Sequence, residues 1–468
     1  MSRLRSCTWR GPAGQTLLVV LTIMLAVTVS AGSFIWYMNR QQARAGLRYR
    51  TVAALSLAQA GVRRALAVFE GTAPDGSPGR LWRPVGYEEV VAAGSLGGGF
   101  RLTVTPERDG AVVVTSDGTA GGVTRRLRAR VYLASPALLA GVSAAGSVQV
   151  GAPSGAVTIV AYAAPADRPW VHIAAATEVW FFTADFPLND AAAALPAGPV
   201  DLLPGASAGA GAADPVQLLL GAEASLALGG DRRPVDPSAL RAAGLRVEDP
   251  WRPDPFPAIP GVDQDFYRDL AAANSANAEI NRQAGELAND PDLRKKPDSF
   301  YDAEQFARVV RFLASRTDPP ELRGILYVAG RVTIPPDVDL RLADGALVAG
   351  NTVKLEEGAR FTVSHTAGTR RLPAVLVLGT GGLVLSAHAE LLAHGLVYAA
   401  QTIEVTPDAG LRVVGAVASN DPGISVRVRG ALTVRYDPAV LGTPGLRVAG
   451  RAPVTAWAAE WQEEMVQR

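Results

Sequence analysis

The 468-residue chain is poor in the side chains that most often build covalent and metal-bound sites. It has one cysteine, Cys7, and four histidines. A single cysteine cannot form an intramolecular disulfide, and a zinc site based on a CxxC pair is excluded. The formal net charge is +1, so overall charge gives no reason to expect nucleic-acid binding. These absences favour a structural or binding protein over an enzyme, with no metal and no cofactor.

Charge is also scarce, at 19% of residues against about 25% in typical soluble domains. Part of the deficit is one charge-free segment, from Gly11 to Asn39. Its apolar core, residues 17–38, exceeds the roughly 20 residues needed to cross the hydrocarbon of a bilayer. Trp36 and Tyr37 stand where an interfacial aromatic belt would lie. The sequence therefore predicts a transmembrane helix over residues 15–40; the alternative is a secretory signal peptide cleaved after Ala31.

The apolar segment continues into an amphipathic one. No proline occurs between Pro12 and Pro74, so one helix can run through both. Apolar residues at spacings of three and four form a stripe suited to packing on a folded domain. The members of this stripe are Val52, Leu55, Ala58, Val62, Leu66 and Phe69.

Two stretches of this region resemble a known family. Residues 14–42 and the stretch Ala58-Gln-Ala-Gly-Val-Arg-Arg-Ala-Leu66 look like the amino-terminal region of PilX-type minor pilins. They are also similar to the PulK/GspK-type pseudopilins of type II secretion. The resemblance implies that a prepilin peptidase cuts the leader after Gly14 and makes Gln15 the new amino terminus, with Gly11 as the alternative cleavage point. Val19 would then be the fifth residue, where major pilins carry glutamate, which argues against a major pilin.

Beyond the helix, residues 98–133 alternate apolar and polar side chains in three runs separated by glycine-containing turns. They predict an antiparallel sheet that covers the helix stripe and completes a small α+β head. Residues 136–260 are rich in Ala, Gly and Pro and predict short strands and loops. Residues 261–320 have helical spacing and more charge; their acids Glu279, Glu286, Asp290 and Asp292 fit a solvated helix face better than a metal site.

Short apolar strands recur from residue 321 onward. Tyr327-Val-Ala-Gly-Arg-Val-Thr-Ile334 can be compared with Leu347-Val-Ala-Gly-Asn-Thr-Val-Lys354 and with Val397-Tyr-Ala-Ala-Gln-Thr-Ile-Glu404. This recurrence predicts stacked rungs, most simply a β-solenoid. Because such folds can carry carbohydrate-active sites, two clusters are candidate catalytic groups: His388, Glu390 and His394, and Asp337, Asp339 and Asp344. Neither belongs to a substrate motif, and we expect no enzyme activity.

The predicted fold class is α+β: a long membrane-to-amphipathic helix packed on a small antiparallel sheet, followed by a carboxy-terminal β-solenoid. The predicted segments are a leader (1–14), a transmembrane helix (15–40), an α+β head (41–135), a strand and loop region (136–260), a helical insertion (261–320), a β-solenoid-like domain (321–452) and a short terminal helix (453–468).

These features predict a minor pilin-like subunit that assembles, primes or decorates the tip of a type IV pilus or related filament. The alternatives are a type II secretion pseudopilin and a membrane-anchored adhesin or polysaccharide-active protein. The expected partners are other pilin-like subunits, the inner membrane with its pilus assembly machinery, and a prepilin peptidase. The expected location is the bacterial inner membrane, crossed once, with the large carboxy-terminal part periplasmic or at the cell surface.

Overall fold

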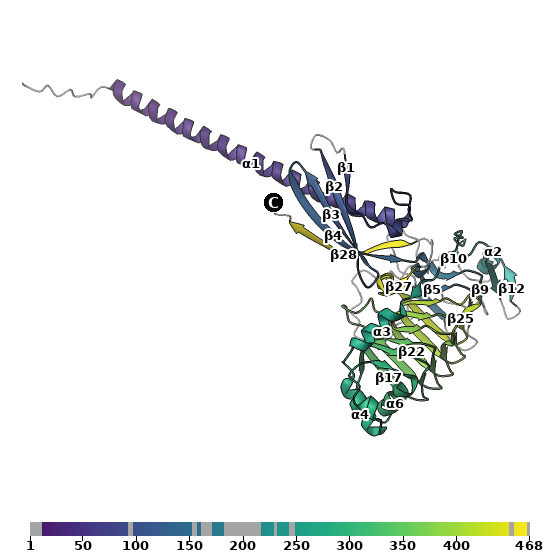
Figure 1. Cartoon of the computed structure of the whole chain (residues 1–468). Helices are drawn as coiled ribbons and strands as arrows, with labels where there is room; N and C mark the ends of the chain where they lie inside the picture. The colour runs from purple at the N-terminus through teal and green to yellow at the C-terminus, as the bar shows by residue number, and fades with distance from the viewer. Residues whose placement is uncertain are drawn as a thin grey trace, which may run out of the picture.

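A computed structural model describes residues 12–91, 97–151, 157–160, 171–181, 217–228, 232–242, 249–448 and 454–465. It contains three parts: a long amino-terminal helix, an antiparallel sheet packed on the carboxy-terminal half of that helix, and a body of stacked parallel strands (Figure 1). We call the sheet with its packed helix the head and the stacked strands with their helices the body.

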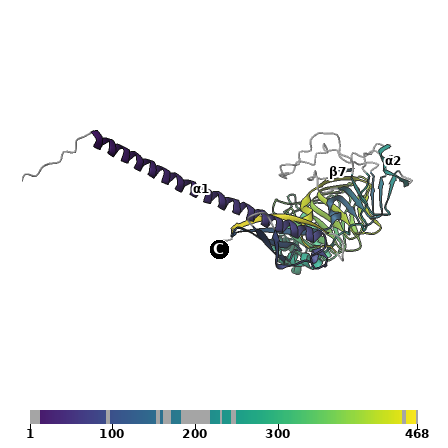
Figure 2. The same ribbon diagram turned by 90° about the horizontal axis from the view of Figure 1, so that it is seen from above.

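Helix α1 (Pro12–Glu70) is continuous over 59 residues, which corresponds to about 88 Å at the usual rise of ~1.5 Å per residue. It ends where glycine and proline interrupt the helical pattern, and the amide of Gly71 donates to the carbonyl of Val68 at 3.0 Å. Its amino-terminal half projects away from the rest of the molecule in both views (Figure 2). The predicted amphipathic helix is therefore present as a direct extension of the apolar segment.

The head sheet has five antiparallel strands in the order β1-β2-β3-β4-β28. Their bounds are β1 (Val85–Val91), β2 (Gly98–Pro106), β3 (Val112–Ala120), β4 (Val123–Ala134) and β28 (Thr455–Met465). Alternate residues of β3 are buried, as the sequence alternation predicts, because one face of the sheet lies against α1. A 3-10 turn, η1 (Gly79–Leu81), connects the helix to the sheet.

The prediction of a short helix over residues 453–468 is wrong. Thr455–Met465 forms strand β28, which pairs with β4 from Thr455↔Ala134 to Met465↔Arg125. The two tryptophans four residues apart, Trp457 and Trp461, suit a helix face, but the free edge of β4 offers a full row of backbone partners. A long-range pairing therefore overrides the local pattern. It also makes the whole body an insertion between two neighbouring strands of the head.

The body contains two large sheets whose strands pair mainly in parallel. The first, of 12 strands, runs β10-β8-β5-β24-β22-β19-β17-β15-β14, with β20 beside β17 and β22, and with β26 beside β24 and β7. Its bounds are β5 (Ala140–Ala144), β7 (Val157–Val160), β8 (Val171–Ala175), β10 (Leu218–Leu220), β14 (Phe300–Tyr301), β15 (Leu322–Val328), β17 (Asp339–Ala349), β19 (Arg360–Ser364), β20 (Val375–Val377), β22 (Glu390–Ala399), β24 (Gly410–Ser419) and β26 (Ala431–Tyr436).

The second sheet of the body has nine strands in the order β12-β11-β9-β6-β25-β23-β21-β18-β16. Its bounds are β6 (Ser147–Val150), β9 (Glu178–Phe181), β11 (Ser225–Leu228), β12 (Arg233–Val235), β16 (Val332–Ile334), β18 (Thr352–Leu355), β21 (Gly382–Leu385), β23 (Ile403–Val405) and β25 (Ile424–Val428). Equivalent residues stack in register, as in Leu391↔Leu411↔Leu432, and their side chains fill a continuous apolar core between the sheets.

The boundary expected between residues 136–260 and 321–452 does not separate two domains. Strand β5 pairs with β24, and β6 pairs with β25, so both segments build the same two sheets. The chain enters the middle of the stack at β5 and extends it outward to β10 and β12. It then crosses to the far end, and strands β15 to β26 return to the middle. Pairing between strands this distant in sequence leaves no local signal.

Helices close both ends of the stack. The predicted helical insertion contains α3 (Gln264–Ala273), α4 (Ala278–Leu287), α5 (Pro291–Arg294) and α6 (Ala303–Ala314), and α6 contacts β16 and β17. At the other end α2 (Pro237–Ala242) buries Leu240 in the core.

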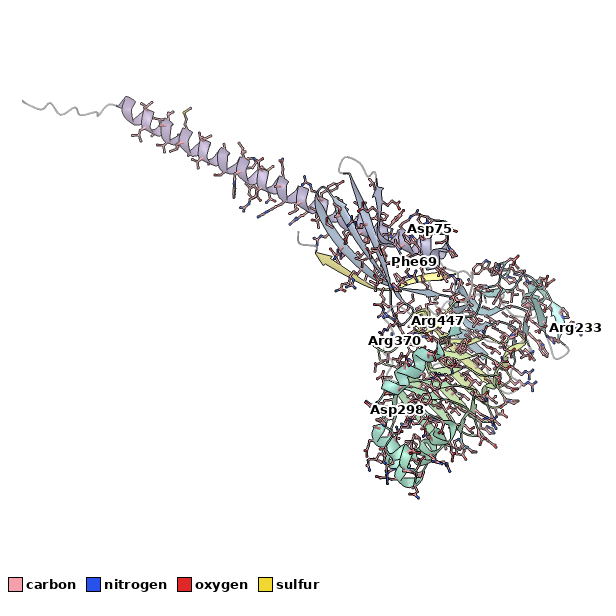
Figure 3. The ribbon with its side chains drawn as sticks, viewed as in Figure 1. Phe69, Asp75, Arg233, Asp298, Arg370 and Arg447 are labelled. Atoms are coloured by element: carbon pink, nitrogen blue, oxygen red, sulfur yellow. The ribbon has the colours of Figure 1, made fainter. Side chains whose placement is uncertain are left out.

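Two further segments join the head to the body. The 3-10 turns η3 (Pro136–Leu139) and η4 (Pro438–Gly442) lie on the outer face of the first body sheet, where a second apolar core forms. A short pair, β13 (Gly261–Val262) with β27 (Leu446–Arg447), lies in the same region. Figure 3 labels Arg370 and Arg447 where head and body meet. Because the chain passes from head to body and back again, two segments of the chain connect the head to the body.

Candidate functional site

The main candidate site is the projecting half of α1, residues 17–38, which we call the apolar segment. Its large apolar side chains are exposed on every side, from 41% at Met38 to 68% at Leu18. Figure 3 shows these side chains standing out from the helix with no other element around them. Among the described residues, α1 is the one helix long and apolar enough to cross a membrane. A surface of this size in a soluble monomer would be a strong aggregation hazard.

The dimensions and chemistry of the apolar segment match a bilayer. Its 22 residues span about 33 Å, against a hydrocarbon thickness of roughly 30 Å. Eleven of them are Leu, Ile, Val or Phe, which together favour insertion by about 3–7 kcal/mol on the translocon scale. The hydroxyls of Thr22 and Thr28 donate to the carbonyls of Leu18 and Met24, each at 2.8 Å, and so need no water. The polar groups of these threonines are therefore satisfied within the helix.

The residues predicted for leader processing lie at the start of α1. Gly14 and Gln15 fall within its first turns, and their side chains lie outside the described residues. Val19 is 56% exposed on the apolar segment. Residues 1–11 of the leader, including Cys7, lie outside the described residues. The structure thus places the fifth-position residue on a free apolar surface.

The packed half of α1 differs partly from the predicted stripe. Ala58, Val62 and Phe69 are buried against the sheet, whereas Leu55 and Leu66 are half-buried. Val52 is 63% exposed, so it is not part of the packed face. The other buried residues of this half were not part of the predicted stripe; they are smaller than its members or lie next to them on the helix. They are Ala54, Leu57, Gly61, Ala65 and Val68.

Two glycines set the distance between helix and sheet. A Cβ on Gly118 of β3 would lie 2.1 Å from the carbonyl oxygen of Ala54 and 2.3 Å from the amide nitrogen of Ala58. A Cβ on Gly61 of α1 would lie 2.2 Å from the hydroxyl oxygen of Ser116. The helix backbone therefore lies directly on the strand, with glycine facing alanine. This close approach fixes the direction in which the apolar segment leaves the head.

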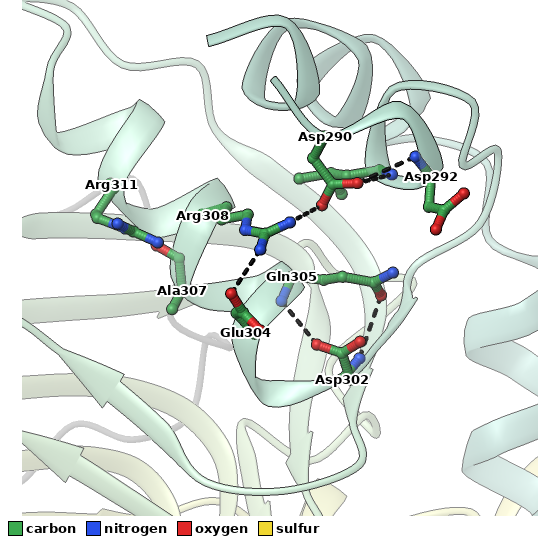
Figure 4. A network of polar contacts seen from close by, with 9 residues as sticks. Asp290, Asp292, Asp302, Glu304, Gln305, Ala307, Arg308 and Arg311 are labelled. Carbon is green, nitrogen blue, oxygen red and sulfur yellow. Dashed lines mark hydrogen bonds and ion pairs between the residues drawn. The ribbon is translucent and has the colours of Figure 1, made fainter. Parts of the chain in front are cut away.

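The acids of the helical insertion are held in ion pairs and caps. Hydrogen bonds from Arg282 and Gln283 lower the pKa of Glu279 to about 2. Arg282 also contacts Glu286 at 2.5 Å. The carboxylate of Asp290 accepts the amides of Leu293 and Asp292, each at 3.0 Å, and contacts Arg308 (Figure 4). Glu279 and Glu286 thus lie on a solvated helical face, whereas Asp290 is buried as the cap of α5 and does not fit that expectation.

Several residues of the two candidate catalytic clusters form ion pairs and hydrogen bonds within the body. Glu390 lies between Arg360, at 2.8 Å, and Arg412, at 3.3 Å. His388 and Asp337 adopt positive φ at turns between strands, and Asp344 adopts positive φ within β17. Asp344 accepts from the amide of Thr366 at 2.7 Å, and Asp339 pairs with Arg341 at 2.8 Å. Within the described residues, no group of three or more His, Cys, Asp or Glu could hold a metal ion.

A junction between head and body is the feature that sequence reasoning missed. Arg371 donates to the hydroxyl of Tyr132 at 3.0 Å, and its guanidinium lies 5.2 Å from the centroid of that ring. The amide of Gly445 donates to the carbonyl of Asp109 at 3.0 Å. Burial raises the pKa of Tyr132 above its ordinary value. The partners are more than 200 residues apart in sequence, so local patterns gave no signal for this contact.

No protein-family model matches the chain, and no curated protein matches it significantly. Among solved structures, the chain is similar to the crystal structure of the competence-associated pilin ComZ from Thermus thermophilus. The sequence identity is 14%, with 89% of this chain and 98% of that chain covered. The TM-score is 0.19, so this similarity does not establish a common fold.

Proposed function

We propose that the chain is a pilin-like subunit, anchored in a membrane by residues 17–38, that joins a helical filament and displays its body outside the cytoplasm. The observation that carries this proposal is the division of α1 into two halves. One half is apolar and uncovered, and the other is packed on the head sheet without a break between them. Such a helix can leave the bilayer for a bundle of similar helices while its head remains folded.

The size of the body favours a tip or low-abundance position. We infer that its two parallel sheets form a β-solenoid, which gives the subunit a large rigid mass beyond the head. A filament shaft requires each subunit to pack closely against its neighbours, and so bulky a body hinders that packing. The role in assembly, priming or tip decoration of a type IV pilus follows from this steric argument together with the PilX-type resemblance of the first helix.

Processing of the leader separates this proposal from its alternatives. Mass spectrometry of the chain purified from membranes should find an amino terminus at Gln15. A Gly14→Val variant should retain its leader, whereas the matched Gly11→Val variant should be processed normally. A terminus at Gly32 would show a signal peptide and overturn the pilin-like proposal. An uncut leader in the unaltered chain would reduce the function of α1 to a plain membrane anchor.

A second experiment separates the pilus from the secretion system. Cross-linking in the native cell should join the apolar segment to other pilin-like subunits of a type IV pilus. Cross-links to secretion pseudopilins would instead favour the type II alternative. We also propose that the chain has no catalytic activity: Glu390→Gln and His394→Gln should leave filament assembly unchanged. A loss of polysaccharide turnover in these variants would favour the adhesin or polysaccharide-active alternative.

A further inference from the structure

The segment of α1 between the apolar segment and the head has an unusual charge distribution. No Asp or Glu occurs before Glu70, while residues 1–69 contain nine arginines. Four of these, Arg40, Arg44, Arg48 and Arg50, lie in residues 39–53, which we call the neck. All four are exposed. Among the residues that the structure describes, no carboxylate forms an ion pair with any of them.

The neck arginines begin at the depth of a lipid headgroup layer. At the usual helical rise of ~1.5 Å per residue, Arg40 and Arg44 lie about 3 and 9 Å beyond Met38 along the helix. Headgroups occupy roughly 5–8 Å on each side of the hydrocarbon. Arg48 and Arg50 follow at about 15 and 18 Å. Their long side chains can bend back toward the same layer.

The arginines also share one side of the helix. At about 100° per residue, the four positions fall within an arc of roughly 160°. Arg50 lies on the head side, since a Cβ on Gly121 would be 3.0 Å from its Cδ. The adjoining turn between β3 and β4 is formed by Gly121 and Gly122 and carries no acid. The nearest acid along β3, Asp117, is already paired with Arg126 at 2.6 Å.

We propose that the neck binds the anionic phospholipid headgroups of the leaflet from which α1 emerges, and so holds the head at a fixed height above that leaflet. This inference rests on the proposed insertion of the apolar segment. Guanidinium groups pair with phosphate through two parallel hydrogen bonds, and anionic headgroups supply phosphate at the required depth. The guanidinium carbon of Arg40 lies 4.8 Å from the ring centroid of Trp36, so the first arginine contacts the interfacial aromatic belt.

Continuity with the span favours lipid over an acidic protein surface. The first arginine follows the apolar segment after a single residue, Asn39, so it is at the membrane surface whenever the segment is inserted. The head first approaches the helix at Arg50, about 18 Å beyond Met38 at the usual rise per residue, and the first buried residue of the helix is Ala54. The neck is therefore long enough to pass through the headgroup layer before any folded element begins.

The test uses the full chain in nanodiscs of phosphatidylcholine with one fifth phosphatidylglycerol. Two samples are prepared, one with bromine on the acyl chains of phosphatidylcholine and one with bromine on those of phosphatidylglycerol. The quenching of Trp36 fluorescence is obtained by subtracting the signal of the Trp36→Phe variant from that of the unaltered chain. The ratio of the two quenching efficiencies, corrected for lipid content, gives the preference for phosphatidylglycerol. We expect a preference of at least about tenfold, since each arginine near an anionic surface adds severalfold, and a decrease toward one in 1 M salt.

Two quadruple variants complete the test. The neck variant R40Q/R44Q/R48Q/R50Q should lose the preference, while the matched variant R108Q/R294Q/R331Q/R429Q, which removes four exposed arginines elsewhere, should keep it. Strong quenching with a preference near one in the unaltered chain would overturn the proposal and leave an acidic protein as the partner of the neck. Absence of quenching by either lipid would show instead that the apolar segment is not inserted, which is a failure of the proposed function itself.

Discussion

Replacing Gly118 with alanine tests whether close contact between α1 and β3 sets the structure of the head. The added Cβ would lie 2.1 Å from the Ala54 carbonyl oxygen and 2.3 Å from the Ala58 amide, whereas ordinary contact begins at 3.4 Å. Both obstructing atoms belong to the helix backbone and cannot rotate away. The helix must therefore move outward by 3.4 − 2.1 = 1.3 Å at this point.

A displacement of this size weakens the packing of the helix. A gap of 0.5–1 Å already removes about a quarter to a half of the dispersion energy of each contact. Overpacked core substitutions cost about 1–3 kcal/mol, and we place Gly118→Ala near 3 kcal/mol because no side chain can relieve the clash. Since about 1.4 kcal/mol is a factor of ten, the opening equilibrium of the head should rise roughly 100-fold.

Hydrogen exchange measured by mass spectrometry on the full chain in nanodiscs reports this change directly. Amides of Val62–Phe69 and of β3 should lose about 100-fold in protection, while those of β22 and β24 in the body should be unaffected. Gly46→Ala is the matched control: its Cβ meets nothing within 4 Å, so it should leave the head unchanged and strengthen the helix by up to about 1 kcal/mol. Head protection within threefold of the unaltered chain in Gly118→Ala would refute the reasoning.

Three further predictions concern single groups. Ser116→Ala should stabilise the head by about 1 kcal/mol in denaturant unfolding, because the fully buried hydroxyl has no hydrogen-bond partner among the described residues; destabilisation would contradict this. Asp302→Ala should lower body stability by about 1 kcal/mol, since Asp302 and Gln305 form a capping box at α6, while Asp302→Asn should lose much less. Burial lowers the pKa of His365 below its ordinary value of 6.5, so the body should lose stability as pH falls below about 6.5 and reach its full loss below the folded-state pKa. His365→Gln should reduce the slope of the melting temperature between pH 7.5 and 5, and an unchanged slope would contradict the assignment.

Local patterns in the sequence were sufficient for several elements. The absence of proline between Pro12 and Pro74 predicted one long helix, and the structure has α1 from Pro12 to Glu70. Alternation predicted the strands at residues 98–133, which the structure has as β2, β3 and β4. These features depend on residues within a few positions of each other, so composition and spacing carry them.

The helix stripe shows where such patterns stop being sufficient. Spacing selected large apolar residues and so included Val52, which is exposed. The actual packed face uses Ala54, Ala58 and Gly61, because β3 presents Gly118 and the backbones approach closely. Which helix face is buried was therefore decided by a glycine about 60 residues later in the chain. Pairing across that distance cannot be obtained from periodicity alone.

The insertion of the body into the head couples the two parts mechanically. Strands β4 and β28 pair along ten positions, and the body begins after one of them and ends before the other. A force applied to the body reaches the head through two adjacent strands, which share it, while Tyr132 and Arg371 brace the junction. A body joined by a single tether would swing independently of the head. Here the direction of the body is coupled to the head sheet, and the sheet is coupled to α1 through Gly118, so the body is held in one orientation relative to α1.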